Sequence, residues 1–351
     1  MKVQIDTTPL YTSRAGVARY VRGLLHGLSR VTPAGVQVEE LGWPVENLGY
    51  AQPARALITL AREWGWAKLV APMRARHADV LHHTALPTIS FLRRPRHVVT
   101  LHDLALLRDP RRFRPWQRRS GLRRLHRVAQ ADRVVCVSRF TADEAIALLG
   151  LPARRLEVVH EGGWLPSTAP DSADLLPVLP DEFFLFVGSL EPGKNLALLR
   201  EIYLSPTQSP LPPLLIVGTR WAGVPHEGSA PSAWRFLGHV SDSILAQLYR
   251  AARALLFPSR YEGFGLPIVE AMACGCPVVC GRVASLPEIG GEAVCYAGLT
   301  PNEFGTAMRR LLKESSLVAQ LRAAGEERAR AFSWEKCARE TLAIYADVTS
   351  A

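Results

Sequence analysis

The residues with the clearest chemical signature stand in the segment FPSRYEGFGLPIVEAMACGCPVV, residues 257–279. An apolar strand is expected to end just before its loop, and a helix to begin around Leu266, because Pro267 suits a first helical turn. Glu262 and Glu270 are eight residues apart, which about two helical turns would place on one side of the structure. The glycines between them let backbone amides approach a ligand closely. Amides at a helix N-terminus form an anion site, for which a diphosphate is a natural occupant.

A basic signal lies upstream in FVGSLEPGKNL, residues 186–196. A strand is expected to end at Gly188, and Lys194 with Asn195 is expected to open a helix. A lysine there adds its charge to the positive end of the helix dipole and strengthens the attraction for a diphosphate. This segment therefore supplies a positive charge for the diphosphate, in addition to the two carboxylates.

Histidines in the first half offer two further candidates. His102 and Asp103 stand in TLHDL, at the expected carboxyl end of a strand, where ligands of doubly wound sheets bind. His82 and His83 are adjacent, as metal ligands sometimes are, but no carboxylate or cysteine follows at ligand spacing. We therefore predict a reaction-centre role for the first pair and no metal site at the second.

The elements that position these residues form two series of strand-then-helix units. Short apolar runs that end in polar or glycine residues are typical of buried parallel strands. The first series has MKVQID, ADVLHH, HVVTLHD, DRVVCVS and LEVVHEG, and the second has FFLFVGS, PLLIVG, WRFLGHV, ALLFPS, CPVVCG and AVCYA. In the helical stretch SDSILAQLYRAA, Ser241 is the expected N-cap. This alternation predicts an α/β protein with two doubly wound parallel sheets facing each other across a cleft.

The Pro- and Ser-rich stretch between the two series is the best linker. The expected organisation is an N-terminal Rossmann-like domain, a linker, a C-terminal Rossmann-like domain and a last helix that packs back on the first domain. Their bounds are residues 1–165, 166–180, 181–330 and 331–351.

The Glu-x7-Glu pair with EGFGLP inside it resembles the signature of family-4 glycosyltransferases, which have the GT-B fold of two Rossmann-like domains. The resemblance extends over essentially the whole chain. It implies that Glu262 contacts the transferred sugar and that Glu270 holds the ribose. It also implies that a run of backbone amides meets the sugar and diphosphate: Gly263, Phe264, Gly265 and Leu266.

The same resemblance assigns the remaining site residues. It makes Lys194 the cation that neutralises the diphosphate; many relatives carry a second basic residue where this chain has Gly193, so Arg260 is a candidate for the missing charge. It places His102 in the reaction centre, with Asp103 orienting its ring or touching the acceptor. Further contacts with the donor are expected at Gly16, Gly188 and Asn195, and contacts with the base at Gly238, His239, Val240 and Leu245.

The activity implied is transfer of a hexose from a nucleotide-sugar donor to a hydroxyl of a glycan or lipid-linked acceptor, with retained configuration and without metal or other cofactor. The form of VGSLEPGKNL and TLHDL is most similar to bacterial mannosyltransferases of surface-polysaccharide assembly, so GDP-mannose is the first donor expected and a UDP-hexose the second. A GT-B epimerase or phosphorylase is the competing enzyme. A basic membrane- or nucleic-acid-binding module is the competing non-enzyme.

Size and composition agree with an ordinary globular protein. The 351 residues suit two domains, and no apolar run reaches the ~18 residues that a membrane-spanning helix needs. Gln4 and Asp6 interrupt any signal-peptide core, so a cytoplasmic location is expected. The six cysteines include no C-x-x-C pair and are expected as buried, reduced thiols.

Charge is concentrated in the first half. Residues 1–165 carry 26 Lys and Arg against 13 Asp and Glu, a net charge of +13, whereas the remainder has −3. Nine arginines lie between Arg108 and Arg127, with Phe113 and Trp116 among them. No nucleic-acid recognition motif accompanies them, so nucleic acid is not an expected partner. An anionic membrane surface beside a lipid-linked acceptor and a merely solvated, Arg-rich helix both remain open.

Overall fold

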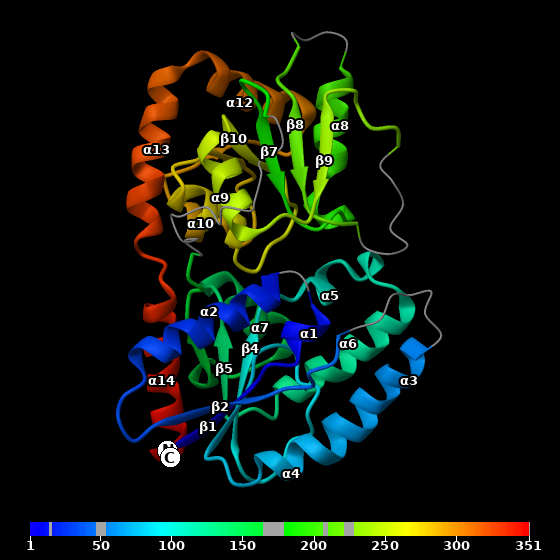
Figure 1. Cartoon of the computed structure of the whole chain (residues 1–351), viewed down its shortest axis with the longest axis vertical. Coiled ribbons are helices and arrows are strands. Elements are labelled where there is room, and N and C mark those ends of the chain that lie inside the picture. Colours follow the sequence, from blue (N-terminus) through cyan, green and yellow to red (C-terminus); the bar gives the residue numbers. More distant parts are fainter. Residues whose placement is uncertain (14–15, 47–53, 164–178, 206–209, 221–227, 351) are drawn as a thin grey trace. The chain divides into compact units, whose positions relative to one another are not determined.

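The computed structural model describes residues 1–13, 16–46, 54–163, 179–205, 210–220 and 228–350. The chain divides into two compact units: unit 1 is Met1–Gly162 with Ser333–Ala351, and unit 2 is Gly163–Phe332. Each unit is built on its own six-stranded parallel sheet (Figure 1). Most of the expected linker, residues 166–178, lies outside the described residues.

Unit 1 has the strand order β2-β1-β3-β4-β5-β6, and every pairing is parallel. The central strands are buried nearly end to end, as a sheet with helices on both faces requires. The sheet contains one strand that the apolar runs did not predict, because its QVEEL sequence is charged and mostly exposed at the sheet edge. The strands are β1 (Lys2–Asp6), β2 (Gln37–Leu41), β3 (Val80–His83), β4 (Arg96–Leu101), β5 (Arg133–Cys136) and β6 (Leu156–Val158).

The helices of unit 1 cover this sheet and carry the connections between its strands. Among them, α3, η1 and α4 follow one another without a break, and the middle segment, η1, is a π-helix. They are α1 (Pro9–Thr12), α2 (Gly16–Val31), α3 (Ala54–Leu60), η1 (Ala61–Val70), α4 (Ala71–Ala75), α5 (Ala105–Arg108), η2 (Pro110–Arg112), α6 (Pro115–Val128), α7 (Arg139–Leu149), η3 (Ala153–Arg155) and α14 (Trp334–Ser350).

The last helix, α14, belongs to unit 1 and packs closely against α2. A Cβ atom at Gly23 would lie 2.1 Å from the Trp334 ring, so only glycine permits this approach. On the sheet side, His82 Nδ1 is 2.6 Å from the Tyr345 hydroxyl, and its Nε2 is 2.8 Å from Thr100 Oγ1. These buried contacts hold the C-terminal helix on the first sheet.

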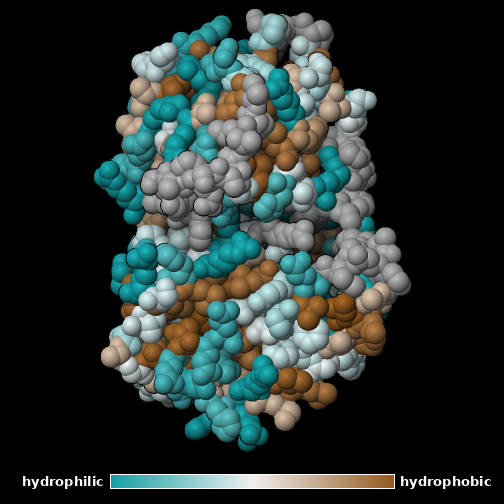
Figure 2. All heavy atoms as spheres, viewed as in Figure 1, coloured by the Kyte–Doolittle hydropathy of each residue, from teal (hydrophilic) through white to brown (hydrophobic). Residues whose placement is uncertain are grey.

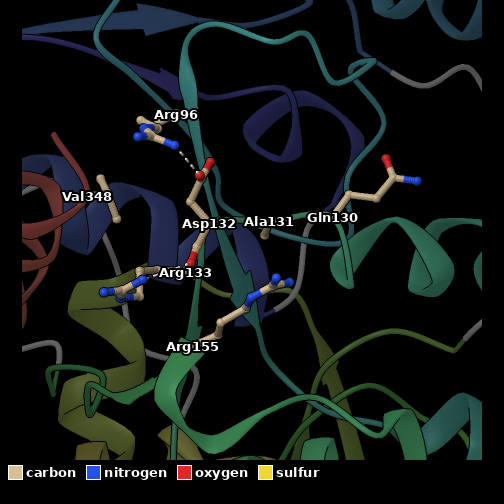
Figure 3. A pocket seen from close by; sticks show the side chains of 7 residues that line it. All are labelled: Arg96, Gln130, Ala131, Asp132, Arg133, Arg155 and Val348. Atoms are coloured by element: carbon tan, nitrogen blue, oxygen red, sulfur yellow. Dashed lines mark hydrogen bonds and ion pairs between the residues drawn. The ribbon is translucent and has the colours of Figure 1, made fainter. Parts of the chain in front are cut away.

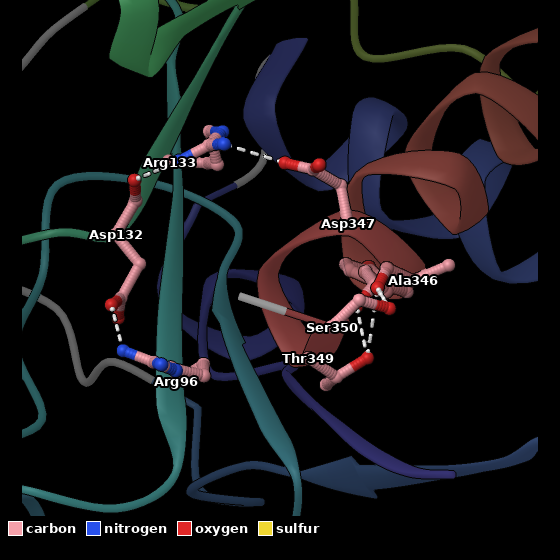
Figure 4. A network of polar contacts seen from close by, with 8 residues as sticks. Arg96, Asp132, Arg133, Ala346, Asp347, Thr349 and Ser350 are labelled. Atoms are coloured by element: carbon pink, nitrogen blue, oxygen red, sulfur yellow. Dashed lines mark hydrogen bonds and ion pairs between the residues drawn. The ribbon is translucent and has the colours of Figure 1, made fainter.

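Ion pairs fasten the same helix at the amino edge of the sheet. A cavity of about 300 Å³ lies there, lined by Arg96, Asp132, Arg133 and Arg155 among others (Figure 3). Arg96 pairs with Asp132 at 3.0 Å, and Arg133 pairs with Asp347 of α14 at 2.5 Å (Figure 4). Because ligands of doubly wound sheets bind at the carboxyl edge, this cavity belongs to the anchoring of α14 rather than to a ligand site.

Unit 2 repeats the design with the strand order β12-β11-β10-β7-β8-β9. Its strands are β7 (Phe184–Val187), β8 (Leu214–Val217), β9 (Trp234–Gly238), β10 (Ala254–Phe257), β11 (Val278–Cys280) and β12 (Cys295–Tyr296). Its helices are η4 (Pro192–Lys194), α8 (Leu196–Leu204), α9 (Asp242–Ala251), α10 (Leu266–Ala273), α11 (Leu286–Gly290), α12 (Pro301–Lys313) and α13 (Ser315–Ala329). One buried apolar cluster joins β7, β8 and β10 to α8 and α12.

The expected α/β fold with two doubly wound sheets is therefore confirmed. Ser241 is the N-cap of α9 as predicted, since its hydroxyl accepts a hydrogen bond from the Ile244 amide. All six cysteines are free, but Cys274 and Cys295 are only partly buried, so the expectation of full burial was wrong for these two. None of the described helices combines the length and apolar character that crossing a bilayer needs.

Candidate active site

The strand order of unit 2 places a ligand site between β7 and β10. From β7 the chain proceeds to one side through β8 and β9, and then crosses to the other side to form β10. At such a reversal, the loops that leave two neighbouring parallel strands diverge and open a crevice at their carboxyl ends. Lys194 follows β7 and Glu262 follows β10, so the topology brings the two predicted residues together.

Lys194 and Glu262 form an ion pair in which the Lys194 ammonium donates a hydrogen bond to the Glu262 carboxylate. Their side chains are 16% and 12% exposed, so each remains in reach of solvent. The Lys194 Nζ also lies 5.5 Å from the centre of the Phe257 ring, at the end of β10. A charged donor and a charged acceptor are thus held side by side, ready for a ligand that carries both phosphate and hydroxyl groups.

The loop that carries Lys194 is fixed by its own polar contacts. Glu191 is buried, and its carboxylate accepts a hydrogen bond from the Gly193 amide at 2.8 Å. Gly193 O accepts in turn from the Arg260 amide at 2.9 Å, which ties this loop to the one after β10. Asn195 adopts a left-handed conformation, with φ of 57°, and is the N-cap of α8. Lys194 therefore stands one residue before the helix cap, in the short turn η4, rather than inside the helix.

The loop after β10 is held by a serine that the sequence motif did not single out. Ser285 is fully buried, and its hydroxyl lies 3.0 Å from Glu262 O and 2.9 Å from Phe264 O. Its amide also reaches Glu262 O, at 3.4 Å. Because these bonds occupy carbonyl groups, they help to fix the peptide planes of the glycine loop. The serine precedes α11 in ASLPEIG, and nothing in that local pattern signals the contact.

After the glycine loop, the segment between Glu262 and Glu270 continues as the N-terminus of a helix. Gly265 has φ of 103°, a conformation that favours glycine, and caps α10, which begins at Leu266. The expectation that two helical turns align Glu262 with Glu270 was wrong, because residues 262–265 form a loop and only Glu270 lies in the helix. Glu270 is buried at 3% exposure and accepts a hydrogen bond from the Tyr249 hydroxyl at 3.1 Å.

The residues expected to meet the base lie at the end of β9. Gly238 has φ of 67°, and its carbonyl accepts a hydrogen bond from the Gly218 amide at 2.7 Å. His239 is exposed and Val240 half-buried, whereas Leu245 is buried on the inner face of α9. The residues of this turn are therefore partly or fully open to solvent, whereas Leu245 belongs to the buried face of α9. Gly188 ends β7 with its amide bonded to Val217 O, and Arg260 is exposed beside the crevice loops.

Unit 1 brings a different set of groups to its carboxyl edge, around His102. The His102 Nδ1 is 3.0 Å from the Glu161 carboxylate, and Nε2 is 2.9 Å from the Thr84 carbonyl oxygen. Both partners are oxygen acceptors, so an imidazolium, which donates from both ring nitrogens, satisfies both contacts. Burial alone lowers the pKa of His102, but the Glu161 hydrogen bond and charge, the Thr84 carbonyl and the Asp103 charge outweigh it and raise the pKa above its ordinary value.

A buried polar row continues from this histidine along the sheet edge. Thr84, after β3, donates its hydroxyl to Asp6 O at 2.6 Å, and Asp6 ends β1. The Asp6 carboxylate accepts a hydrogen bond from the Thr8 amide at 3.0 Å, and burial raises the pKa of Asp6 to about 6. The sequence interpretation missed Thr84 and Glu161 as partners of His102, and Asp6 as the residue that supports Thr84. All three stand at or shortly after the carboxyl end of an apolar strand run, which predicts their place at this edge but not their pairing with His102.

Asp103 and Gly16 occupy places that limit their expected roles. The Asp103 carboxylate accepts a hydrogen bond from the Ala105 amide at 2.9 Å, at the start of α5, and is exposed. The expectation that Asp103 orients the His102 ring was wrong, because Glu161 and Thr84 bind both ring nitrogens. Gly16 is exposed and is the first residue of α2, and the residues just before it, 14 and 15, lie outside the described part.

The adjacent histidines on β3, His82 and His83, make buried contacts that stabilise unit 1. His82 is the buried bridge to α14 described above, and burial lowers its pKa to about 3, so it is neutral. His83 Nε2 lies 3.0 Å from His97 Nδ1, and both rings stack with Phe91. Within the described ranges, no three His, Cys, Asp or Glu side chains converge as a metal site would require.

Comparison with known proteins agrees with this geometry. Residues 14–162 match the family described as Glycosyltransferase Family 4, and residues 181–314 match the family described as Glycosyl transferases group 1. O-antigen chain mannosyltransferase B of Escherichia coli is 35% identical over 274 residues, which cover 71% of this chain and 70% of that protein. The chain belongs to the family-4 glycosyltransferases. The protein is therefore an enzyme, as predicted.

A second relative and a solved structure are also similar, the second of them in fold alone. The serotype-specific mannosyltransferase WbdA of Escherichia coli is 28% identical over 261 residues; these cover 69% of this chain and 32% of that protein, about a third of its length. Sucrose-phosphate synthase from Thermosynechococcus elongatus has a similar structure, with a TM-score of 0.70 and 19% identity over 100% of this chain and 99% of that one. The predicted GT-B fold is confirmed.

Proposed function

We propose that this glycosyltransferase moves mannose from GDP-mannose to a hydroxyl of a glycan or lipid-linked acceptor, with retention of configuration and without a metal ion. The observation that carries the proposal is the Lys194–Glu262 pair at the reversal between β7 and β10. It presents an ammonium, a carboxylate and a glycine-lined helix N-terminus at one sheet edge. Support for mannose comes from the two mannosyltransferase relatives, of which O-antigen chain mannosyltransferase B matches most of the chain.

The chemistry follows from where charge develops. When the bond between the anomeric carbon and the β-phosphate oxygen breaks, negative charge builds on the departing diphosphate and positive charge on the sugar. Lys194 leaves Glu262 to neutralise the phosphate, and the amides of residues 263–266 add fixed donors that need little reorganisation. Glu262, once released, accepts hydrogen bonds from the sugar hydroxyls. Glu270, bonded to Tyr249 at the inner end of the site, holds the ribose.

The proton balance excludes His102 as the general base in this scheme. Both of its ring nitrogens already carry protons and donate them within unit 1. We therefore assign the acceptor proton to the departing phosphate oxygen, while the acceptor oxygen forms its bond to the anomeric carbon on the same face. Glu161 and Thr84 hold His102 as a fixed charge at the edge of the reaction site. GDP and the α-configured mannoside are the products.

A transfer assay with defined donors tests this proposal. GDP-mannose, UDP-glucose and UDP-galactose are supplied with a lipid-linked glycan acceptor pool, and the anomeric configuration of the product is read by NMR. We expect transfer from GDP-mannose with the α-anomer retained. Transfer from a UDP-hexose alone would replace the donor, an inverted product would overturn the mechanism, and release of free sugar phosphate would indicate a phosphorylase.

We also propose that unit 1 rests on an anionic membrane surface, on the cytoplasmic side, through the segment from Arg108 to Arg127. The positive charge of the first half and the exposed Trp116 support this. Each basic residue near such a surface contributes about 1 kcal/mol. Changing Arg118, Arg119 and Arg123 to Glu should abolish co-sedimentation with phosphatidylglycerol vesicles at low salt. If the wild-type protein stays in the supernatant, the segment is a solvated face.

A further inference from the structure

The segment after His102 contains a cavity that the donor chemistry does not use. It has a volume of about 430 Å³, within the usual range for small-ligand sites. Its lining combines three arginines with an apolar floor: Arg111, Arg118, Arg119, Phe113, Leu122, Pro110 and Pro115. A site that is both basic and apolar fits a ligand that carries phosphate on a hydrocarbon chain.

The three arginines of this cavity differ from their neighbours. Arg108 pairs with Glu144 at 2.5 Å and Arg124 with Glu63 at 2.8 Å, so the charges on those sides are compensated. No carboxylate in the described part of the chain pairs with the guanidinium groups that line the cavity. Concentrated and uncompensated positive charge, beside the N-terminus of the 14-residue helix α6, attracts a multiply charged anion.

The floor of the cavity is rigid because it belongs to the core of unit 1. Phe113 and Leu122 are partly buried and pack against the apolar cluster that contains Leu106 and Leu125. A Cβ atom at Gly121 would lie 2.5 Å from Leu106 Cδ2, so α6 crosses α5 at close range. The cavity is therefore a preformed feature of the fold, with exposed arginines around a fixed apolar base.

The topology places this cavity at the reactive edge of the first sheet. Strand β4 ends at Leu101, and α5, η2 and the first turn of α6 follow directly after His102. Helix α6 then returns along the sheet to the start of β5, which is parallel to β4. The N-terminus of α6 must therefore lie at the carboxyl edge, the same edge that holds His102 and Glu161.

An apolar surface continues beyond the cavity. Helices α3, η1 and α4 expose a series of large side chains: Leu57, Leu60, Trp64, Leu69, Val70 and Met73. The Arg124–Glu63 pair joins η1 to α6, so this surface adjoins the basic helix. Figure 2 shows brown atoms gathered where Figure 1 places α3. Large apolar side chains exposed in such number on neighbouring helices are typical of an interaction surface.

We infer that the arginine-lined cavity binds the diphosphate of a lipid-linked acceptor, with the first part of its hydrocarbon chain along the exposed face of α3 and η1. The inference rests on the proposed glycosyltransferase function and specifies its acceptor: a glycan carried on an apolar alcohol through phosphate. Its position at the His102 edge favours the acceptor over the headgroups of the surrounding bilayer, since a headgroup needs no preformed cavity at the sheet edge that carries His102.

Calorimetric titration with dodecyl diphosphate below its micelle concentration tests the inference without any need for turnover. Saturating GDP occupies the donor site during the titration. The Arg118→Ala/Arg119→Ala variant should bind the probe at least about tenfold more weakly than the wild type, because each lost guanidinium contact to phosphate costs on the order of 1 kcal/mol or more. Arg123→Ala is the matched control: an exposed arginine on the same helix that does not line the cavity, expected to bind like the wild type.

Two further titrations separate the sources of affinity. Dodecyl maltoside, which is uncharged, should bind all three proteins equally weakly, and inorganic pyrophosphate should bind less tightly than the dodecyl ester. Equal loss in the cavity variant and in Arg123→Ala would overturn the inference in favour of diffuse charge. Unchanged binding of dodecyl diphosphate together with weaker binding to phosphatidylglycerol vesicles would overturn it in favour of bilayer headgroups. The rise in melting temperature that GDP causes in the same proteins reports on the donor site independently. Absence of that rise would count against the proposed function, whatever the result for dodecyl diphosphate.

Discussion

The carboxyl edges of the two sheets carry different kinds of polar contact. At the edge of unit 2, Lys194 and Glu262 are partly exposed and form an ion pair with each other across two loops. At the edge of unit 1, His102, Thr84 and Glu161 form a row in which every polar group has a partner within the unit. The first arrangement can exchange its internal pair for a ligand, whereas the second is fixed.

This difference separates a binding site from a supporting frame. An ion pair that a ligand must break suits a charged substrate that arrives and departs, because the ligand restores each lost contact. An imidazolium held between two acceptors resists change, because loss of either partner leaves its charge or a donor unsatisfied. Substitutions at the two edges should therefore have distinguishable consequences for activity and for protonation.

The largest effect is expected at the exchangeable pair. Glu262→Gln or Lys194→Ala should lower the transfer rate by ~100-fold or more, because each removes a charge contact from a preorganised site. Circular dichroism should remain like that of the parent, since neither side chain supports the core. Lys313→Ala, an exposed lysine of the same unit, is the control and should retain full activity. Near-parental turnover in either site variant would remove that residue from the mechanism.

The fixed row should respond through the protonation of His102. Glu161→Gln removes the carboxylate that raises the pKa of His102 and leaves the burial that lowers it. The pKa of the ring should then fall: Nε2–H still donates to the Thr84 carbonyl, Nδ1 can accept from the glutamine amide, and loss of the positive charge should reduce activity by about tenfold. NMR titration of the ring measures this pKa directly. Glu157→Gln, which changes an exposed carboxylate on β6, is the control and should leave the pKa of His102 as in the parent. An unchanged pKa of His102 in Glu161→Gln would contradict the proposed pairing.

A smaller effect, on stability, is expected at the β1 end of the same row. The pKa of Asp6 is raised to about 6 in the fold, above its ordinary unfolded value, so the folded state holds its proton more tightly. Ionisation of Asp6 therefore costs stability as pH rises from about 4 to 6, up to about 3 kcal/mol. Asp6→Asn should be more stable than the wild type at pH 8, with the gap closing toward pH 4. Urea unfolding of both proteins at pH 8 and pH 4 measures this difference in the free energy of unfolding. A difference that does not change with pH would contradict the raised pKa of Asp6.

No effect is expected from chelation. Because the ammonium of Lys194 and the backbone amides are assigned to the diphosphate, EDTA should leave the transfer rate unchanged. Metal-free buffers with and without added magnesium give the comparison. Collapse of activity with EDTA and recovery with magnesium would show that the charge at the unit 2 edge is incomplete without a cation.

The same contrast explains what the sequence could predict. The residues of the proposed donor site in unit 2 lie in contiguous segments, so the spacing around Glu262 and the position of Lys194 could predict it, and apolar runs located nearly every strand. The two partners of His102 follow β3 and β6, and no local pattern links Glu161 to a histidine 59 residues away. Ser285 is another long-range support. Helix geometry also misled where a loop intervened, between Glu262 and Leu266.

Binding of GDP-mannose to wild-type protein and to Lys194→Ala tests the central claim most directly, because it needs neither acceptor nor turnover. Isothermal titration should show one site per chain in the wild type, with at least about tenfold weaker affinity in the variant, as expected for loss of a charge-assisted contact to the diphosphate. The Glu161→Gln variant should bind GDP-mannose like the wild type, since its row lies in unit 1. Equal affinity in wild type and Lys194→Ala would contradict the assignment of the β7–β10 edge as the donor site.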